Sequence, residues 1–333
     1  MSNSNGASRP KIAVIGAGLA GLACAAELQA RDFLVDIFEK SRGSGGRMST
    51  RRGADWAVDH GAQYFTARDP LFINALSSWL DQKQVALWAP ELKVFENGQW
   101  QTIQSNDKRY VATPGMSSLG KYLAQPLSVQ HEQTIKQIER VGSTWVLHTN
   151  EAGQISRTYE GLVLAIPSPQ ALALVNGLDT EASQLAAATQ MNACWTLMIK
   201  FATQPALELD AGFVNHDIIS WLCRNASKPE RSDRDYWVVH ANPIWSQTFI
   251  ELSKEEATAQ IVERLTRLGF HCQGAEITTH RWRYASGFLE TQPECYLSAE
   301  THLGLCGDWL HGGRVEGAWL SGYKLAHRMA VSY

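Results

Sequence analysis

The stretch Lys11-Ile-Ala-Val-Ile-Gly16-Ala-Gly18-Leu-Ala-Gly21-Leu22 decides the fold of this chain. It begins as an apolar run typical of a buried strand, continues with the spacing G-x-G-x-x-G, and ends in the Ala- and Leu-rich sequence of a helix. In such a turn Gly16 permits the sharp bend, Gly18 lets a pyrophosphate approach the backbone, and Gly21 lets the helix pack on the strand. The helix N-terminus then offers free N–H groups to phosphate. The stretch therefore predicts a nucleotide-binding unit.

Two further features follow this turn. A second strand is predicted over 34–39, and it ends at Glu39, 18 residues after Gly21, where an acidic residue is expected to bind a ribose. The next segment, Lys40-Ser-Arg-Gly43-Ser-Gly45-Gly46-Arg47-Met48, combines glycines with arginines and predicts a second phosphate-binding loop. The alternatives are a glycine turn that only packs a helix, and a solvated basic loop.

Length and composition exclude several classes of protein. A chain of 333 residues predicts one large domain or two interleaved domains. The net charge of −3 gives no basic field for nucleic acid, and no apolar run approaches the ~18 residues of a membrane span. The six cysteines form no C-x-x-C pair, which favours reduced thiols and a cytoplasmic location. The ten histidines lack ligand spacing, so no metal site is expected.

The middle of the chain differs from its two ends in the pattern of predicted secondary structure. Alternating patterns over 92–112, 128–149 and 194–284 predict antiparallel strands with helices, whereas the last segment returns to an apolar strand ending at Gly307-Asp308 and a helix that opens near Arg314. Between them, Val58-Asp-His-Gly61-Ala-Gln-Tyr64-Phe65 places small residues next to aromatic ones. This pattern suits backbone lying flat against a planar ring, with Tyr64 lining a pocket; the alternative is an ordinary tight turn.

Taken together these motifs carry a family resemblance. The glycine turn, Glu39, Gly45-Gly46-Arg47, the segment 59–64, Gly307-Asp308 and Glu316-Gly317-Ala318 resemble the FAD-dependent amine oxidase superfamily, which shares the p-hydroxybenzoate hydroxylase fold. Finer strings resemble its bacterial renalase branch over about residues 10–330: Lys40-Ser-Arg-Gly-Ser-Gly-Gly-Arg-Met48, Arg224-Asn-Ala-Ser-Lys-Pro-Glu-Arg231, His280-Arg-Trp-Arg-Tyr-Ala285 and Gly313-Arg-Val-Glu-Gly-Ala-Trp-Leu-Ser-Gly322.

The resemblance implies noncovalent FAD, since no cysteine or histidine occupies a flavin-attachment motif. It places the pyrophosphate on the glycine turn, the adenosine ribose on Glu39, adenine on the backbone of Ile135, and a ribityl hydroxyl or phosphate on Asp308. The helix opening at Val315 is expected to aim its N-terminus at the flavin, where reduced flavin carries negative charge. The expected FAD-binding residues are Gly16, Ala17, Gly18, Gly21, Glu39, Lys40, Gly46, Arg47, Gly61, Ala62, Gln63, Ile135, Asp308, Val315, Gly317 and Ala318.

The resemblance also implies a reaction. Renalases are associated with oxidising the 2- and 6-dihydro isomers of NAD(P)H to NAD(P)+, with O2 giving hydrogen peroxide, a hydride transfer that needs no general base. The expected partners are thus a dihydropyridine dinucleotide and O2. Pocket candidates are Tyr64, His240 and Trp282, although a single His or Trp on a strand is often only a core residue. Arg224, Lys228, Arg231 and Arg234 are candidates for binding dinucleotide phosphates, with a solvated loop as the alternative.

The predicted fold is α/β: a Rossmann-type FAD-binding domain interleaved with an antiparallel-sheet α+β substrate domain. The FAD domain is assigned residues 10–69, 114–169 and 286–333, and the substrate domain residues 70–113 and 170–285. Two rival functions stay open at this point, an amine oxidase or desaturase with an aromatic cage for a neutral amine, and a flavin-binding module without turnover.

Overall fold

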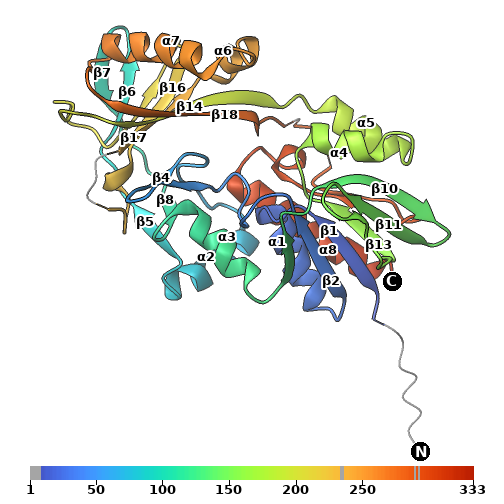
Figure 1. Ribbon diagram of the computed structural model, residues 1–333. Coiled ribbons are helices and arrows are strands. Elements are labelled where there is room, and N and C mark those ends of the chain that lie inside the picture. The colour runs from blue at the N-terminus through green and yellow to red at the C-terminus, as the bar shows by residue number, and fades with distance from the viewer. Residues whose placement is uncertain (1–8, 233–235, 289, 292) are drawn as a thin grey trace, which may run out of the picture. The chain divides into compact units, whose positions relative to one another are not determined.

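The computed structural model describes residues 9–232, 236–288, 290–291 and 293–333. The chain folds as two compact units, each assembled from separate segments (Figure 1). The first unit contains the residues up to Gly46, Gly120–Gln190 and Phe288–Tyr333, and the second contains Arg47–Leu119 and Met191–Gly287. The predicted domains assign residues 47–69, 114–119, 170–190 and 286–287 differently, and the functions given to the two domains stay predictions.

A parallel sheet forms the centre of the first unit. Its strand order is β19-β20-β13-β1-β2-β9, and only β19 runs antiparallel to its neighbour. The strands are β1 (Lys11–Ile15), β2 (Leu34–Glu39), β9 (Ser128–His131), β13 (Gly161–Leu164), β19 (Tyr296–Leu297) and β20 (Leu303–Leu305). All four residues of β13 are buried, as expected for a parallel strand covered on both faces.

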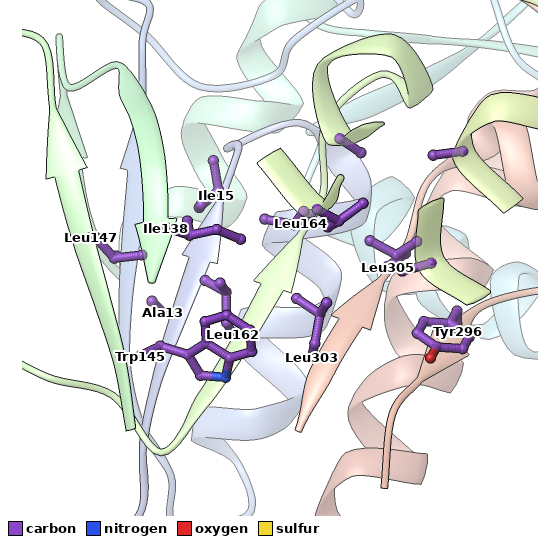
Figure 2. Packing of buried hydrophobic residues seen from close by; sticks show 14 of the residues in the cluster. Ala13, Ile15, Ile138, Trp145, Leu147, Leu162, Leu164, Tyr296, Leu303 and Leu305 are labelled. Carbon is purple, nitrogen blue, oxygen red and sulfur yellow. The ribbon is translucent and has the colours of Figure 1, made fainter. Parts of the chain in front are cut away.

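The two faces of this sheet have different covers. On one face Ala13, Leu162 and Leu303 pack with residues of two helices and of a small antiparallel sheet, as Figure 2 shows for Ile138, Trp145 and Leu147. The covering elements are β10 (Ile135–Val141), β11 (Thr144–Thr149), β12 (Gly153–Gln154), α4 (Ser168–Val175) and α5 (Thr180–Ala188). On the other face Ile12, Val14 and Val163 pack against α1 (Leu19–Gln29) and α8 (Val315–Val331). This alternation places the sheet in the middle of three layers.

The carboxyl ends of the parallel strands bring distant segments of sequence together. β1 leads into α1, and β20 leads through the short 3₁₀ helix η2 (Asp308–Leu310) into α8. Because β1, β2, β13 and β20 are parallel, their carboxyl ends lie at one edge of the sheet, and both helices begin there. Glu39 at the end of β2 lies at this same edge.

The second unit is built on a seven-stranded sheet of order β18-β14-β17-β16-β15-β6-β7. All neighbours in it are antiparallel except β15 and β6. The strands are β6 (Leu92–Glu96), β7 (Gln99–Thr102), β14 (Asn192–Lys200), β15 (Ala211–Val214), β16 (Ile219–Arg224), β17 (Tyr236–Ala241) and β18 (Glu276–Ser286). The parallel beginning and the antiparallel middle of the chain confirm the predicted α/β fold class.

One face of the seven-stranded sheet forms an apolar core. Leu197, Ile199 and Val239 on this face pack with Ile261 and Leu265 of α7 (Lys254–Arg267), which lies over the sheet with α6 (Pro243–Thr248) (Figure 1). The other elements of the unit are β3 (Thr50–Arg52), β4 (Ala57–Asp59), α2 (Pro70–Asp81), β5 (Val85–Trp88), β8 (Arg109–Ala112) and the 3₁₀ helix η1 (Asn225–Ser227), while α3 (Met116–Ala124) spans the division between the units.

Membrane-spanning helices are absent from the described part of the chain, in which no helix is both long enough and apolar enough to cross a bilayer.

The close packing of α1 against α8 predicts that a larger side chain at Gly322 destabilises the protein. A Cβ atom added to Gly322 would lie 2.0 Å from the backbone oxygen of Ala20, so Gly322→Ala must push the helices apart. We expect a loss of about 1–3 kcal/mol in the free energy of unfolding, despite the better helix propensity of alanine. A Cβ at Gly43 meets no atom within 4 Å, so Gly43→Ala serves as the control in thermal and denaturant unfolding. Equal stabilities of the two variants would contradict this packing.

Candidate functional site

The glycine turn after β1 leaves no room for side chains at two of its three positions. Gly16 has φ +103°, and a Cβ there would lie 2.6 Å from the Ala165 oxygen; a Cβ on Gly21 would lie 2.0 Å from the Gly16 oxygen. At Gly18, in contrast, a Cβ would meet no atom within 4 Å. The turn is therefore tight on its inner side and open at Gly18, the position at which a phosphate is expected.

The second glycine loop lies directly beside the first. The backbone N–H of Gly45 donates to the Ala17 oxygen at 2.8 Å, and Gly18 and Gly45 form an isolated parallel bridge. Gly46 has φ +56°, and a Cβ there would lie 3.2 Å from the Gly18 Cα. Two glycine loops with close backbones can surround a phosphate group with main-chain N–H donors. Lys40 is exposed at the start of this loop.

Glu39 joins three segments at the edge of the sheet. Its buried carboxylate accepts hydrogen bonds from the N–H groups of Ala17 at 2.8 Å and Ser41 at 2.7 Å. Its backbone oxygen accepts from the N–H of Gln133 at 3.0 Å, which holds the start of β10, and thus Ile135, near by. An ionised carboxylate offers about four acceptor positions, so Glu39 keeps capacity for ribose hydroxyls.

The start of α8 lies at the same edge of the sheet as the two glycine loops and Glu39. Asp308 in η2 is buried, and a Cβ on Gly317 would lie 1.7 Å from the His311 oxygen, so the chain closes tightly before the helix. No side chain caps α1 or α8, whereas Asp69, Asp179 and Ser253 cap α2, α5 and α7. The α4 N-terminus also lacks a side-chain cap. The uncapped N–H groups of α1 and α8, at one sheet edge, fit a ligand with a pyrophosphate and a second acceptor. Val315 and Ala318 lie in the first turn of α8.

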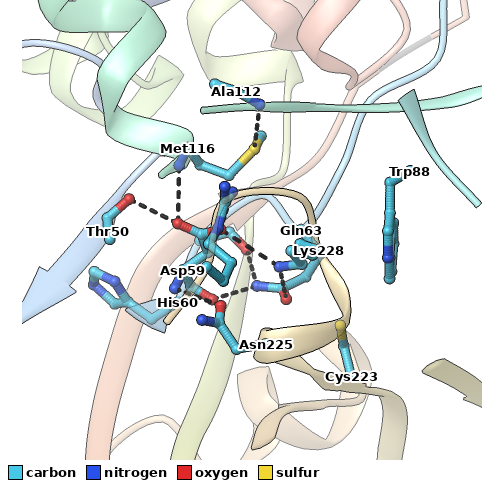
Figure 3. A network of polar contacts seen from close by, with 12 residues as sticks. Thr50, Asp59, His60, Gln63, Trp88, Ala112, Met116, Cys223, Asn225 and Lys228 are labelled. Carbon is cyan, nitrogen blue, oxygen red and sulfur yellow. Dashed lines mark hydrogen bonds and ion pairs between the residues drawn. The ribbon is translucent and has the colours of Figure 1, made fainter. Parts of the chain in front are cut away.

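In the second unit a buried carboxylate organises the loop 57–63 (Figure 3). The Asp59 side chain is 0% exposed, and its Oδ2 accepts from Arg231 Nη2 at 2.6 Å and lies 3.6 Å from Lys228 Nζ. Its Oδ1 accepts from Thr50 Oγ1 at 2.7 Å and from the N–H of Met116 at 2.9 Å. Burial by itself would raise the pKa of Asp59, but the two cations and these hydrogen bonds hold that pKa below its usual range.

Lys228 also holds the second half of the loop 57–63. Lys228 Nζ donates to Gln63 Oε1 at 2.9 Å, and Gln63 Nε2 donates to the oxygens of Asp59 and Gly61 at 2.7 and 3.0 Å. The N–H of Ala62 donates to the Arg47 oxygen, and a Cβ on Gly61 would lie 2.0 Å from that oxygen. Gly61, Ala62 and Gln63, which the sequence predicts to bind FAD, are thus packed into one tight turn.

Several predicted phosphate-binding cations have other partners. Lys228 and Arg231 are buried against Asp59, so the structure gives them a structural role that sequence reasoning did not foresee. Arg47 Nη1 donates to the Ala285 oxygen at 3.1 Å. Arg224 is half-buried at the end of β16, and Arg234 lies outside the described residues.

The register of four adjacent strands forms a row of side chains on the face of the seven-stranded sheet opposite the apolar core. His280 of β18 lies opposite Thr196 of β14, which lies opposite His240 of β17, which in turn lies opposite Trp221 of β16. Directly paired residues of antiparallel strands point to the same face. Trp282, two positions from His280, lies on this face as well.

His60 connects the Asp59 loop to this row. Its backbone oxygen accepts from Trp282 Nε1 at 3.1 Å and from His240 Nε2 at 3.3 Å. Its ring stacks on Trp282 at 5.1 Å and meets His280 edge-on at 4.9 Å, and its buried Nδ1 has no hydrogen-bond partner in the described residues. The structure therefore brings two predicted pocket residues, His240 and Trp282, to a single carbonyl oxygen.

The three imidazoles of this cluster are neutral at pH 7. Burial lowers the pKa of His60 to about 3 and the pKa values of His240 and His280 to about 4. The positive charge of Arg51 lowers the pKa values of His60 and His280 further. Neutral imidazoles and an indole form a surface of aromatic faces with few charges, which suits a planar ring.

Tyr64, the third predicted pocket residue, lies in a neighbouring aromatic group. Its ring is 6.0 Å from Trp88 and 5.6 Å from Trp221, and the Arg109 guanidinium lies 5.4 Å from the ring centre. Sequence reasoning missed His60, Thr196, Trp221 and His280 as partners of His240. Thr196, Trp221 and His280 align with His240 only through the pairing register between strands, and His60 reaches them from the loop after β4, so no local pattern could have brought the four together.

The chain matches two family models. The model for an NAD(P)-binding Rossmann-like domain matches residues 14–77, and the model for flavin containing amine oxidoreductases matches residues 85–330, about three quarters of the chain. The chain belongs to the flavin-containing amine oxidoreductase family. It is an FAD-dependent oxidoreductase, and the residues at the sheet edge of the first unit fit that cofactor.

Solved structures share the fold across almost the whole chain. An Exiguobacterium sp. 255-15 protein assigned as a protoporphyrinogen oxidase is 12% identical, with TM-score 0.78 and coverage of 98% of this chain and 100% of that one. Cyclohexylamine oxidase from Brevibacterium oxydans IH-35A is 14% identical (TM-score 0.75, coverage 97% and 99%). The CLA-producing fatty acid isomerase from P. acnes is 12% identical (TM-score 0.75, coverage 97% and 99%). At these identities the likeness concerns the fold alone.

The position of Glu39 predicts its contribution to cofactor binding. Glu39→Ala removes charge-assisted hydrogen bonds to a ribose, each worth about 1.5–3 kcal/mol, and should raise the Kd of FAD about 10-fold or more. The measurement is fluorescence titration of apoprotein with FAD, with Glu255→Ala in the exposed face of α7 as the control. An unchanged Kd of Glu39→Ala would remove Glu39 from the site. Acid should release FAD from the wild-type protein and from the variants, and flavin retained by the precipitate would contradict noncovalent binding.

The neutral histidines predict a dependence of stability on pH. Their pKa values in the folded protein, about 3 to 4, lie below the ~6.5 of an unfolded histidine, so between those values the unfolded chain binds more protons. The free energy of unfolding should therefore decrease as the pH falls from about 6.5 towards 4. His280→Gln should make this dependence shallower, while His271→Gln, in an exposed loop, should not. Denaturant unfolding at several pH values gives the slope, and equal slopes for the two variants would contradict the assignment.

Proposed function

We propose that this protein is a renalase-like oxidase, which converts the 2- and 6-dihydro isomers of NAD(P)H to NAD(P)+ and passes the electrons to O2 to give hydrogen peroxide. The observation that carries the proposal is the group of neutral imidazole and indole rings on the second unit, two of which, His240 and Trp282, donate to the His60 carbonyl oxygen. FAD supplies the hydride acceptor and the reaction with O2.

The chemistry of the substrate agrees with this surface. A dihydropyridine that loses a hydride becomes an aromatic pyridinium, so no proton has to be removed from it. The site has to hold the ring in one orientation, and orientation alone is worth several powers of ten in rate. With pKa values of about 3 to 4, His60, His240 and His280 are weak bases at neutral pH, and they fit a reaction without a general base.

His240 and Trp282 are fixed in place before any ligand binds. Both donate to the His60 oxygen, which limits their rotamers. If His240 carries its proton on Nε2, as the bond to a carbonyl oxygen requires, Nδ1 is an acceptor. That acceptor suits the N–H of a nicotinamide carboxamide, and the stacked pair of Trp282 and His60 suits the face of its ring.

The substrate prediction is tested by anaerobic stopped-flow reduction of the holoenzyme. The 2- or 6-dihydro isomer should remove the oxidised-flavin absorbance rapidly, and ordinary 4-dihydro NADH should do so at least about 100-fold more slowly, because misplacement of the donor carbon by about 1 Å costs that much. A panel of primary amines should react slowly. Fast reduction by an amine and none by the isomers would replace the proposal with an amine oxidase, and no reduction by either would favour a non-catalytic flavin-binding module.

Substitutions in the row should separate ring binding from cofactor binding. Trp282→Ala and His240→Ala should slow flavin reduction by the isomers about 10- to 100-fold while leaving FAD bound, because they remove ring contacts and leave the glycine turn intact. His271→Ala is the matched control. Reduction at the wild-type rate in both row variants would show that the substrate does not bind at this surface.

A further inference from the structure

Arg109 at the start of β8 is a buried cation that forms no ion pair with any residue the structure describes. The residue is 8% exposed, its Nη1 donates to the Asp107 oxygen at 3.1 Å, and its Nη2 donates to Ser105 Oγ at 3.1 Å. Its Nε is buried and has no hydrogen-bond partner among the described residues. Within the same residues the guanidinium makes no ion pair, and the Asp107 carboxylate pairs instead with Arg68 at 3.7 Å.

This arrangement is costly for a protein that only has to fold. A buried charge normally has a countercharge, because removing an ion from water costs several kcal/mol. Lys228 and Arg231 of the same unit follow that rule through Asp59, and Arg109 does not. An external anion with acceptor oxygens would complete the pairing.

The surroundings of Arg109 supply a further hydrogen-bond donor. Arg109 packs on the ring of Tyr64, which is half-buried, and Tyr64 packs on Trp221. Trp221 is 6% exposed, and its indole N–H is buried without a partner in the described residues. Two donors from separate strands, each with an N–H that has no hydrogen-bond partner in the described residues, therefore pack on the Tyr64 ring, and a phosphate group provides acceptor oxygens and negative charge for both.

We propose that Arg109, with Trp221 and Tyr64, forms the subsite that binds the phosphate groups of the dinucleotide substrate, with the partly exposed Tyr64 side chain moving aside to admit them. The proposal rests on the proposed function, because it assigns the part of that substrate remote from the reacting ring. Its place in the unit agrees: Trp221 is paired directly with His240, so the Arg109 subsite lies beside the end of the row that holds the ring. The ribose separates ring and phosphates in such a substrate, which requires neighbouring subsites.

The experiment compares three reductants of decreasing charge. The 2-dihydro isomers of the dinucleotide, of the mononucleotide and of the riboside present the same ring with two, one and no phosphates. In anaerobic reduction of the holoenzyme, Arg109→Gln should raise the apparent Kd of the dinucleotide about 10- to 100-fold and leave both that of the riboside and the reduction rate at saturation unchanged. Arg109→Lys should recover part of the affinity, since it keeps the charge without the guanidinium geometry.

Two further variants test whether a change in net charge or in stability explains the result. Arg283→Gln removes one positive charge from an exposed residue that pairs with Glu251 and should behave as wild type, which excludes a general effect of net charge. Trp221→Phe keeps the ring packing but loses the indole donor, and should weaken dinucleotide binding severalfold even if Arg109→Gln proves unstable in thermal unfolding with FAD bound. Equal changes for dinucleotide and riboside, or no change in either variant, would overturn the subsite.

A second measurement separates this subsite from the proposed reaction. Inorganic pyrophosphate should bind the oxidised holoenzyme in calorimetry, and Arg109→Gln should abolish that binding while Arg283→Gln should not. If no isomer reduces the wild-type flavin, the reaction fails, and pyrophosphate binding decides the subsite: dependence on Arg109 supports an anion site, and binding that is absent or independent of Arg109 overturns it.

Discussion

The buried charge of Asp59 is the constraint on which the candidate substrate site depends. A carboxylate with no exposure to water requires compensation, and Lys228 and Arg231 supply it from a segment about 170 residues further along the chain. This pairing fixes the loop 57–63, and with it the His60 carbonyl that accepts bonds from β17 and β18. Loss of the Asp59 pairing would therefore disturb the aromatic row without touching any of its side chains.

The candidate cofactor site on the first unit and the proposed substrate site on the second unit are built from different chemical groups. At the edge of the parallel sheet, the candidate cofactor site consists mainly of main-chain N–H groups, glycines without room for a Cβ, and two helices without side-chain caps. Main-chain N–H groups at helix N-termini bind phosphate and other anionic oxygens. On the second unit the proposed substrate site consists of side chains on strands, which can change without a change of fold.

This division explains why similar structures catalyse different reactions. The chain shares its fold with proteins named as a cyclohexylamine oxidase and as a fatty acid isomerase, at identities of 14% and 12%. These proteins share the fold with this chain, whereas the neutral histidines, Trp282 and Arg109 are observed in this chain itself.

The sequence by itself determined the parallel βαβ beginning, the antiparallel middle and the position of Glu39, because glycine spacing and strand patterns are local and appear directly in the residue order. It also indicated His240 and Trp282 as residues of one region. Tertiary structure decided the rest. Strand register aligned His280, Thr196, His240 and Trp221, and burial turned Lys228 and Arg231 from candidate phosphate ligands into the counterions of Asp59. Register and burial arise from contacts between residues far apart in the chain, and no local pattern records them.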